Sequence, residues 1–234
     1  MRDHSAAIAG YWDAAAASFD EEPDHGLRAD ATRAAWAALL RSWLPAPPAE
    51  VLDAGCGTGS LSLLLAEDGH RVVGVDLSRK MIERARAKFA AAQVEGRSVE
   101  GRFLVGDAAV PPTDGTSFDA VLCRHLIWTL PDPVAALREW VARLRPGGRL
   151  VLVEGRWGRS GEGSVPYADG AGGLPWQGGV GAADLAACVR PLVAGLRIEP
   201  LSDVQDLWGG AVSDERYALI GEAGEAGEAG EIRG

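Results

Sequence analysis

The sequence has few cysteines, no long apolar run and no cluster of basic residues. Its three cysteines, Cys56, Cys123 and Cys188, form no CxxC pair. This usage fits a reducing compartment better than a disulfide scaffold, and the spacing offers no zinc site. The N-terminus lacks the apolar core of a signal peptide, and no run is long enough to span a bilayer. We therefore expect a soluble, cytoplasmic protein with no membrane partner.

The protein has a negative net charge, part of which lies near the C-terminus. The formal net charge is −10, and residues 221–234 contribute −3 of it through four Glu and one Arg. Because no Lys/Arg cluster could follow a phosphate backbone, we expect no nucleic-acid partner. Residues 221–234 repeat Gly-Glu-Ala, with one apolar side chain larger than Ala, and this composition predicts a disordered tail.

The most informative stretch is VLDAGCGTGS, residues 51–60. An apolar pair leads into an acidic residue, glycines follow at 55, 57 and 59, and an apolar stripe begins beyond them, which predicts strand, tight turn and helix. Glycine permits backbone angles that a side chain forbids and lets a ligand approach the main chain. The start of the helix offers free N–H groups to a polar ligand.

Short apolar segments alternate with helical patterns from residue 49 onward. We predict strands at 49–54, 71–75, 100–105, 118–123 and 148–154, helices at 59–68, 78–92 and 132–144, and then a helix at 181–190 and strands at 196–201 and 212–220. This alternation indicates an α/β fold whose parallel sheet is covered on both faces. Ligands of such sheets bind outside the carboxyl ends of the strands.

Two segments fall outside this alternation. Helical spacing at 5–20 and 31–43, a break at 22–26 and a candidate cap at Asp30 predict a helical lid over residues 1–46. Residues 155–180 form a long Gly-rich segment, which is typical of a functional or mobile loop. We thus predict a lid at 1–46, one domain at 47–220 and the tail at 221–234.

Asp76 ends the second predicted strand, where it is placed to accept hydrogen bonds from both hydroxyls of a ribose. The plainer alternative is that Asp76 only precedes a helix capped by Ser78. The turn reads DxGxGxG with Asp53 ahead of the first glycine, and this differs from the GxGxxG turn of dinucleotide-binding folds.

Five ordered stretches carry a family resemblance: VLDAGCGTG (51–59), VVGVDLS (72–78), VGDA (105–108), FDAV (118–121) and LRPGGRL (144–150). Together they resemble the motifs of class I S-adenosylmethionine-dependent methyltransferases over residues 49–154. The resemblance implies a Rossmann-like sheet of seven strands in the order 3-2-1-4-5-7-6 with the last strand antiparallel. It also implies S-adenosylmethionine as cofactor, S-adenosylhomocysteine as product and no metal.

The resemblance also implies which residues hold the cofactor. Gly55, Cys56, Gly57 and Gly59 would border its methionine part, Asp76 would hold the ribose, Leu77 and Met81 would flank the adenine, and Asp107 with Ala108 would meet the amino edge of that ring. We also assign Tyr11, Asp53 and Arg124 to the cofactor site, although a surface salt bridge is an equal alternative for Arg124.

Three further stretches narrow the resemblance: CRHLIWTLPDP (123–133), VLVEGRW (151–157) and YWD (11–13). They are similar to small bacterial enzymes that methylate natural products and other metabolites. The CRHL segment replaces the PPY-type tetrad of enzymes that methylate exocyclic amino groups of adenine. We therefore expect a small-molecule acceptor methylated on N, O or an activated carbon, by a monomer or a homodimer.

Methyl transfer from a sulfonium needs alignment and a fairly apolar pocket, and aromatic faces tolerate the cation. We predict Trp12, Trp128 and Trp157 at the acceptor, with core packing as the alternative for each. His125 or His25 is the candidate base, and Glu154 the candidate anchor of a substrate amine. The plain alternatives are a loop-orienting His125, a turn residue at His25 and an ion pair at Glu154. We predict His70 at the surface and Asp132 as a helix cap.

Three rival functions stay open at this point. The first is methylation of a peptide or protein group by the same chemistry. The second is an NAD-type enzyme on a similar sheet, which would need a further substrate domain. The third is a module that binds the cofactor without catalysis.

Overall fold

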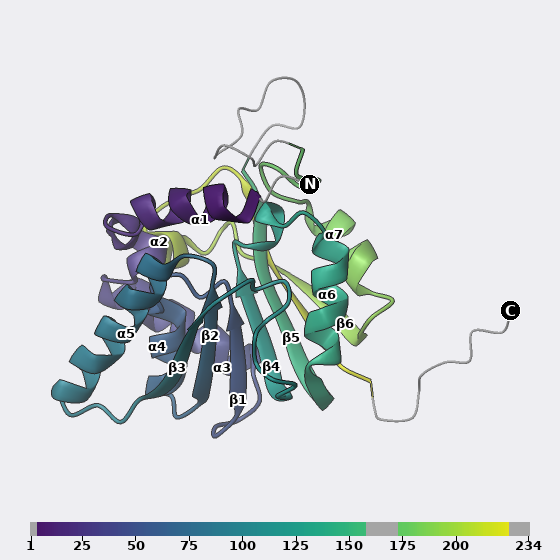
Figure 1. Cartoon of the computed structure of the whole chain (residues 1–234). Helices are drawn as coiled ribbons and strands as arrows, with labels where there is room; N and C mark the ends of the chain where they lie inside the picture. Colours follow the sequence, from purple (N-terminus) through teal and green to yellow (C-terminus); the bar gives the residue numbers. More distant parts are fainter. Residues whose placement is uncertain (1–3, 158–172, 225–234) are drawn as a thin grey trace, which may run out of the picture.

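In a computed structural model, which describes residues 4–157 and 173–224, the chain forms a seven-stranded sheet between helical layers (Figure 1). The strand order is β3-β2-β1-β4-β5-β7-β6. The first five strands are parallel, and β7 is antiparallel to both β5 and β6. The strands are β1 (Glu50–Ala54), β2 (Arg71–Asp76), β3 (Glu100–Val105), β4 (Phe118–Arg124), β5 (Leu144–Arg156), β6 (Ala194–Pro200) and β7 (Glu215–Glu222). The predicted α/β fold, its strand order and the antiparallel last strand are confirmed.

Both faces of the central strands are buried, as continuous apolar runs in parallel sheets require. Successive side chains of a strand point to opposite faces. Val51 accordingly packs in one core with Trp36, while its neighbour Leu52 packs in a second core with Trp140. The sheet therefore separates two apolar cores, and its polar chemistry is confined to the strand ends.

The helices cover the two faces and one edge of the sheet. They are α1 (His4–Ala15), η1 (Phe19–Glu21), α2 (Pro23–Gly26), α3 (Asp30–Trp43), α4 (Ser60–Glu67), α5 (Arg79–Val94), η2 (Ile127–Thr129), α6 (Pro133–Ala142), α7 (Ala182–Val189) and α8 (Gln205–Trp208). Ser78 caps α5 by accepting from the N–H of Met81, and Asp132 caps α6 by accepting from that of Ala135, which confirms both predicted caps. Asp30 is not a cap, because α3 starts at Asp30 and its N-cap is Ala29.

Several element boundaries differ from those predicted. β5 begins at Leu144, which pairs with Phe118 ahead of a register shift. The prediction started later because the first residues of this strand include Pro and Gly and resemble a loop. β7 extends to Glu222, which pairs with Arg149, so the predicted tail boundary at residue 221 is wrong. The short helices α2, η2 and α8 were not predicted. Residues 158–172 of the predicted loop and 225–234 of the predicted tail lie outside the described residues.

The helical cover over the strand ends is shorter than predicted. Helix α1 lies across the upper edge of the sheet in Figure 1, and η1 and α2 follow it. Helix α3 instead belongs to the layer beside the sheet, because Trp36 and Trp43 are buried in the core. The indole N–H of Trp36 also donates to the carbonyl of Leu207, 3.0 Å away. The covering segment is therefore α1 to α2, and we call it the lid.

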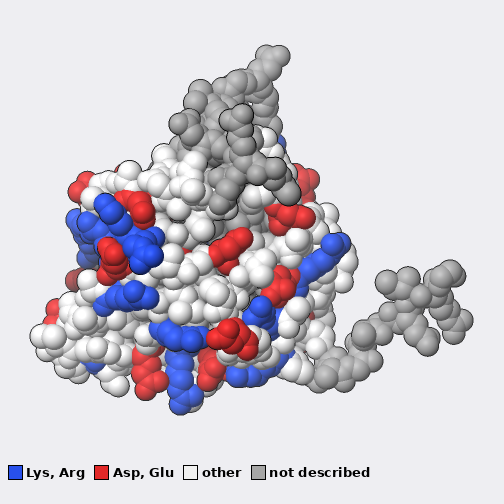
Figure 2. Space-filling model, in the orientation of Figure 1, with Lys and Arg blue, Asp and Glu red and all other residues white. Residues whose placement is uncertain are grey.

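Basic and acidic side chains are interspersed on the face drawn in Figure 2, and neither sign forms a continuous surface there. Within residues 4–157 and 173–224, no helix combines the length and the apolar character needed to cross a bilayer. The absence of nucleic-acid and membrane partners stays a prediction.

Candidate functional site

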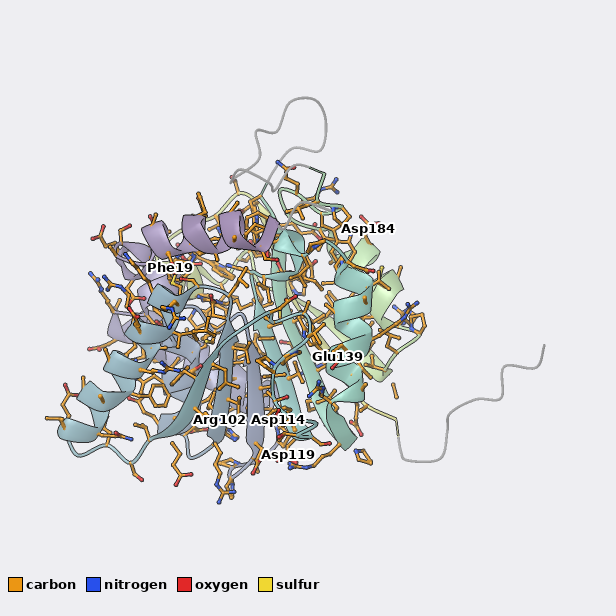
Figure 3. All side chains as sticks on the ribbon, viewed as in Figure 1. Phe19, Arg102, Asp114, Asp119, Glu139 and Asp184 are labelled. Carbon is orange, nitrogen blue, oxygen red and sulfur yellow. The ribbon has the colours of Figure 1, made fainter. Side chains whose placement is uncertain are left out.

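A cavity of about 470 Å³ lies at the carboxyl ends of β1, β2, β4 and β5, beneath the lid. Figure 3 labels Phe19, one of its lining residues, below α1 at this edge, and Asp119 at the opposite end of the strands. The volume is in the range of small-molecule sites. The lining includes most of the residues that the sequence singled out: Trp12, His25, Asp53, Gly55, Cys56, Gly57, Asp76, Leu77, Met81, Asp107, Ala108, Arg124, His125, Trp128 and Trp157.

The glycine turn between β1 and α4 forms one wall. Gly55, Gly57 and Gly59 have φ values of 76°, 53° and 75°, which are left-handed angles that favour glycine. Gly55 and Gly57 line the cavity. Gly59 does not line the cavity. It faces α5 instead, where a Cβ would lie 2.9 Å from the Cβ of Ala85. The predicted cofactor role of Gly59 is thus replaced by close packing of α4 against α5.

Asp76 closes β2 and fixes this turn. One carboxylate oxygen accepts from the backbone N–H of Gly57 at 2.9 Å, and the other accepts from that of Ser78 at 2.8 Å. Burial raises the pKa of Asp76 to about 6, although both hydrogen bonds favour the ionised form. Each oxygen keeps the capacity to accept a further hydrogen bond, as binding of two ribose hydroxyls requires.

Asp53, the acid ahead of the glycines, is buried at the end of β1. Its carboxylate accepts from the hydroxyl of Ser62 at 2.5 Å. Burial raises the pKa of Asp53 to about 6, and the hydrogen bond from Ser62 and the charge of Arg124 oppose that shift. Asp53 is thus a buried acid in the cavity wall with one protein hydrogen bond and room for a cationic ligand group.

The loop after β4 forms the opposite wall and carries His125. This residue has a φ of 54°, an angle that is uncommon for a residue with a side chain. The loop is held by Glu154, whose Oε1 accepts from the backbone N–H groups of Leu126 and Ile127 at 3.0 and 2.9 Å. The indole N–H of Trp128 donates to the carbonyl of His125 at 2.9 Å. The strained conformation of His125 is therefore fixed by two neighbouring side chains.

The structure corrects the expectation for Glu154. Its side chain is fully buried and is not among the cavity-lining residues, so it does not anchor a substrate amine from there. Burial raises the pKa of Glu154 to about 8, and its Oε2 has no hydrogen-bond partner among the described residues. Glu154 acts on the site through the loop that it holds.

Two more predicted positions differ. Tyr11 is 41% exposed and does not line the cavity, so its assignment to the cofactor site is not supported by its position. His70 is buried at the start of β2 rather than exposed, and burial lowers its pKa.

The lid is tied to the cofactor-facing elements by two carboxylates. Asp13 of α1 accepts from the hydroxyl of Ser78 at 2.5 Å and from the N–H of Lys80 at 3.0 Å. Asp20 of η1 accepts from the hydroxyl of Thr58 at 2.5 Å and lies 3.1 Å from Nζ of Lys88. Because these contacts reach the glycine turn and the start of α5, the lid position depends on the same segments that would hold a cofactor.

The far end of the cavity contains residues that sequence reasoning missed. Phe19 stacks on His25, with ring centroids 4.2 Å apart. Asp24 and Arg216 also line the cavity, and Nη1 of Arg216 lies 3.7 Å from Oδ2 of Asp24. Arg216 is second in β7, and an antiparallel strand starts at the edge where its parallel neighbours end. The predicted antiparallel direction of the last strand was the signal that could have placed Arg216 here.

Comparison with known proteins agrees with this geometry. Residues 52–152 match the sequence profile of a family described as a methyltransferase domain. This match and the strand order support the resemblance of the chain to class I S-adenosylmethionine-dependent methyltransferases. The NAD-type alternative is thereby set aside.

Two curated relatives carry the match over part of their length. A demethylmenaquinone methyltransferase of Thermus thermophilus is 40% identical over 109 residues, which are 46% of this chain and 47% of that protein. A ubiquinone biosynthesis O-methyltransferase of Xanthomonas campestris is 37% identical over 106 residues, 45% of this chain and 43% of that protein. The matched region thus spans less than half of the length of each relative.

A solved structure matches over nearly the whole chain. The N-methyltransferase NodS of Bradyrhizobium japonicum, in complex with S-adenosylhomocysteine, has a TM-score of 0.62 and 16% identity, and the match covers 92% of this chain and 99% of that one. At this identity the likeness concerns the fold alone.

Proposed function

We propose that this protein is a methyltransferase that transfers the methyl group of S-adenosylmethionine to a small-molecule acceptor. The observation that carries the proposal is one continuous cavity with two different ends. The glycine turn and Asp76 lie at one end, and His25, His125 and Trp157 lie at the other. A donor and an acceptor bound at these two ends would meet inside one enclosed space.

The residues of the first end fit the cofactor. Asp76 would hold the ribose, Leu77 and Met81 would flank the adenine, and Asp107 with Ala108 would meet its amino edge. Gly55, Cys56 and Gly57 would border the methionine part, whose ammonium would face Asp53. Arg124 supplies a guanidinium for the carboxylate of that part. When bound, the cofactor supplies a methyl group on a positively charged sulfur.

The chain contributes alignment, exclusion of water and proton transfer. The lid contacts of Asp13 and Asp20 close the cavity over the glycine turn. Trp12, Trp128 and Trp157 supply aromatic wall to orient a flat acceptor. His125 and His25 are the groups that would receive a proton from the acceptor. These groups would hold the acceptor atom in line with the methyl group that the bound cofactor would supply.

The acceptor belongs to the small metabolites rather than to peptides in this proposal. Both curated relatives carry the names of quinone-modifying methyltransferases. Hydroxylated aromatic compounds are therefore the first acceptors to test, with the natural products expected from the sequence as the second set. Methylation of a basic peptide is the competing outcome.

The test combines calorimetry with product analysis. S-adenosylhomocysteine should bind with one site per chain, and candidate acceptors incubated with S-adenosylmethionine should gain one methyl group by mass spectrometry. Binding without transfer to any acceptor or peptide would favour a non-catalytic module. Absence of cofactor binding would overturn the proposal.

A further inference from the structure

The acceptor end of the cavity brings together three polar side chains from two elements. Asp24 and His25 come from α2 of the lid, and His125 follows β4. The atoms of these three residues that could bind a proton or a cation lie within 4.8 Å of one another. Nδ1 of His25 and Nε2 of His125 are buried and have no hydrogen-bond partner among the described residues. Two imidazoles, each with one nitrogen atom that has no partner among the described residues, thus line the same cavity.

The charges around the two imidazoles differ. Burial lowers the pKa of His125 well below 6.5, and every charged group that adds to this effect is basic, namely Arg124, His25 and Arg216. Burial and Arg124 also lower the pKa of His25, but Asp24 and Glu22 oppose this shift. Oδ2 of Asp24 lies 3.9 Å from Nε2 of His25. Of the two histidines named above as possible bases, His25 is the better placed to receive a proton, because Asp24 lies beside it. The Nε2 atom of His125 is left to hydrogen-bond a ligand.

Two guanidinium groups flank this pair. Arg124 donates from Nη1 to the backbone carbonyl of Asp24 at 2.5 Å, and within the described residues it forms no ion pair. Arg216 lies over the ring of Trp208, with Cζ 4.4 Å from the centroid, and pairs with Asp214 and Asp24. Burial raises the pKa of Glu154 near Arg124 to about 8, so this acid is largely neutral at pH 7.

This arrangement favours a negative charge over a metal ion. Two imidazoles and one carboxylate form a ligand set that transition metals accept. Arg124 and Arg216 would repel a divalent cation there and attract an oxygen anion beside His125. The carboxylate of Asp24 acts in the opposite sense, but it is already paired with Arg216. An ammonium group at the same position would be repelled in the same way as the metal ion.

The walls restrict the shape of the ligand. The ring of Trp157 meets His125 edge to face at 4.7 Å between centroids, and Trp128 meets Trp157 at 6.3 Å. Phe19 lies flat on His25. Aromatic surfaces on both sides of the imidazoles select a flat, apolar group that carries one polar atom.

We propose that the acceptor is a flat compound with an acidic hydroxyl, phenolic or enolic, which binds as an oxyanion beside His125 and Arg216 after its proton passes to the imidazole of His25. Asp24 stabilises the resulting imidazolium. The negative charge left on the acceptor makes it the nucleophile for methyl transfer. This inference deepens the proposed function and rests on it.

The experiment uses 4-nitrophenol, whose ionised form has its own visible absorbance. The full-length protein is titrated with the probe below the pH at which the free probe ionises, with and without saturating S-adenosylhomocysteine. We expect the bound probe to be ionised, with about a tenfold or greater rise in the ratio of ionised to neutral form, which is one pKa unit. Bound probe that stays neutral would overturn the proposal.

Matched variants locate the effect. Arg216→Gln and His25→Gln should lose most of the added ionisation, and Arg216→Lys should retain part of it because the charge is kept. Arg190→Gln, at an exposed position after α7, should behave as the native protein. Equal ionisation in all variants would contradict the assignment. Calorimetry with S-adenosylhomocysteine on each variant separates this result from failure of the cofactor site.

The same titration tests the metal alternative. Added Zn²⁺ should not increase the ionised fraction, and a chelator should not reduce it. If ionisation required zinc and disappeared with the chelator, the three side chains would be a metal site and the proposal would be wrong. Binding of 4-nitroaniline as tightly as 4-nitrophenol would equally overturn the preference for an acidic hydroxyl.

Discussion

The acidic residues at the two ends of the strands differ in their partners and in the direction of their pKa shifts. At the carboxyl end Asp53 and Glu154 are buried and Asp76 is half-buried, and burial raises the pKa of each. At the amino end Asp119 accepts from the N–H of Glu50 at 2.7 Å and pairs with Arg145 at 2.7 Å. Burial is the largest single influence and acts to raise the pKa of Asp119, but the hydrogen bonds and the charge of these partners together outweigh it, and the pKa is lowered. The amino end is satisfied by the protein itself, whereas the carboxyl end has capacity left for a ligand.

Buried polar atoms without partners follow the same division. Of the four such side-chain atoms in the described part of the chain, those of His25, His125 and Glu154 lie around the carboxyl end, and only that of His70 lies at the other end. A buried polar atom without a hydrogen-bond partner lowers the stability of the folded protein. Such atoms gather at the carboxyl ends of the strands, which is where a functional site is expected.

The largest expected difference between the two ends is in how the free energy of unfolding changes as the pH rises toward 8. Burial raises the pKa of Glu154 from 4.5 to about 8, so the stability from its proton is full below pH 4.5 and is lost as the pH rises to about 8. The loss is up to about 1.4 kcal/mol per pH unit. Glu154→Gln cannot ionise and still accepts from Leu126 and Ile127. The free energy of unfolding in urea should therefore depend less on pH between about 6 and 8 in this variant.

Asp53 and Asp76 act in the same direction only up to about pH 6, so they do not obscure the Glu154 effect above that value. Asp119→Asn, at the amino end, is the matched control and should keep the native slope. Equal slopes for the native protein and Glu154→Gln would show that Glu154 stays ionised in the folded protein.

The next effect concerns cofactor affinity. Asp76→Ala removes the acceptors proposed for the ribose and should weaken binding of S-adenosylhomocysteine by about tenfold or more, or about 1.4 kcal/mol, by isothermal titration calorimetry. Asp119→Ala should leave the affinity unchanged, because Asp119 lies at the other end of the sheet. Native affinity in Asp76→Ala would remove Asp76 from the site.

A smaller effect is expected on acid stability. Burial lowers the pKa of His70 below 6.5, so the unfolded chain binds a proton first and stability falls as the pH drops below 6.5. His70→Gln should reduce this loss, measured by urea unfolding between about pH 5 and 7. His25 and His125 contribute with the same sign, whereas Asp53, Asp76 and Glu154 act in the opposite direction over this range, so the test is the difference between the slopes of the variant and the native protein. An unchanged slope would mean that His70 titrates normally.

The smallest effect is expected for an ion pair at the amino end. Arg145→Ala breaks the contact with Asp119 and a longer one of 3.7 Å to Glu50. These side chains are partly exposed, so the loss in free energy of unfolding should be about 0.2 to 1 kcal/mol. Cofactor affinity and turnover should not change. A loss of affinity would show that the two ends of the sheet are coupled.

Local pattern was sufficient to predict that the glycine turn and Asp76 line one cavity. The turn at 51–60 and Asp76 each follow a strand, and the residues that follow parallel strands share one edge, so their proximity follows from strand order. The same reasoning placed Glu154 in the cavity and was wrong. Successive residues of a strand alternate between faces, and only the packed structure shows that the side chain of Glu154 is turned under the β4 loop.

The acceptor end depended on contacts that no local pattern describes. Asp24 and His25 lie in a segment whose sequence predicts only a break between two helices. In the structure this segment forms α2, which places both residues next to His125. Arg216 reaches the same place from the start of β7. Because the lid and β7 are far from β4 in the chain, their meeting depends on how the lid packs, and helical or strand periodicity carries no information on it.

The amino-acid sequence by itself indicated the α/β alternation and the glycine turn, because both are encoded in local patterns, and its ordered motifs carried the resemblance that implied the strand order and the predicted cofactor residues. Only the tertiary structure decided which side chains face the acceptor and how they are charged. Burial and the charge of distant neighbours set the pKa values of His25, His125 and Glu154, and both arise only when segments far apart in the chain are packed together.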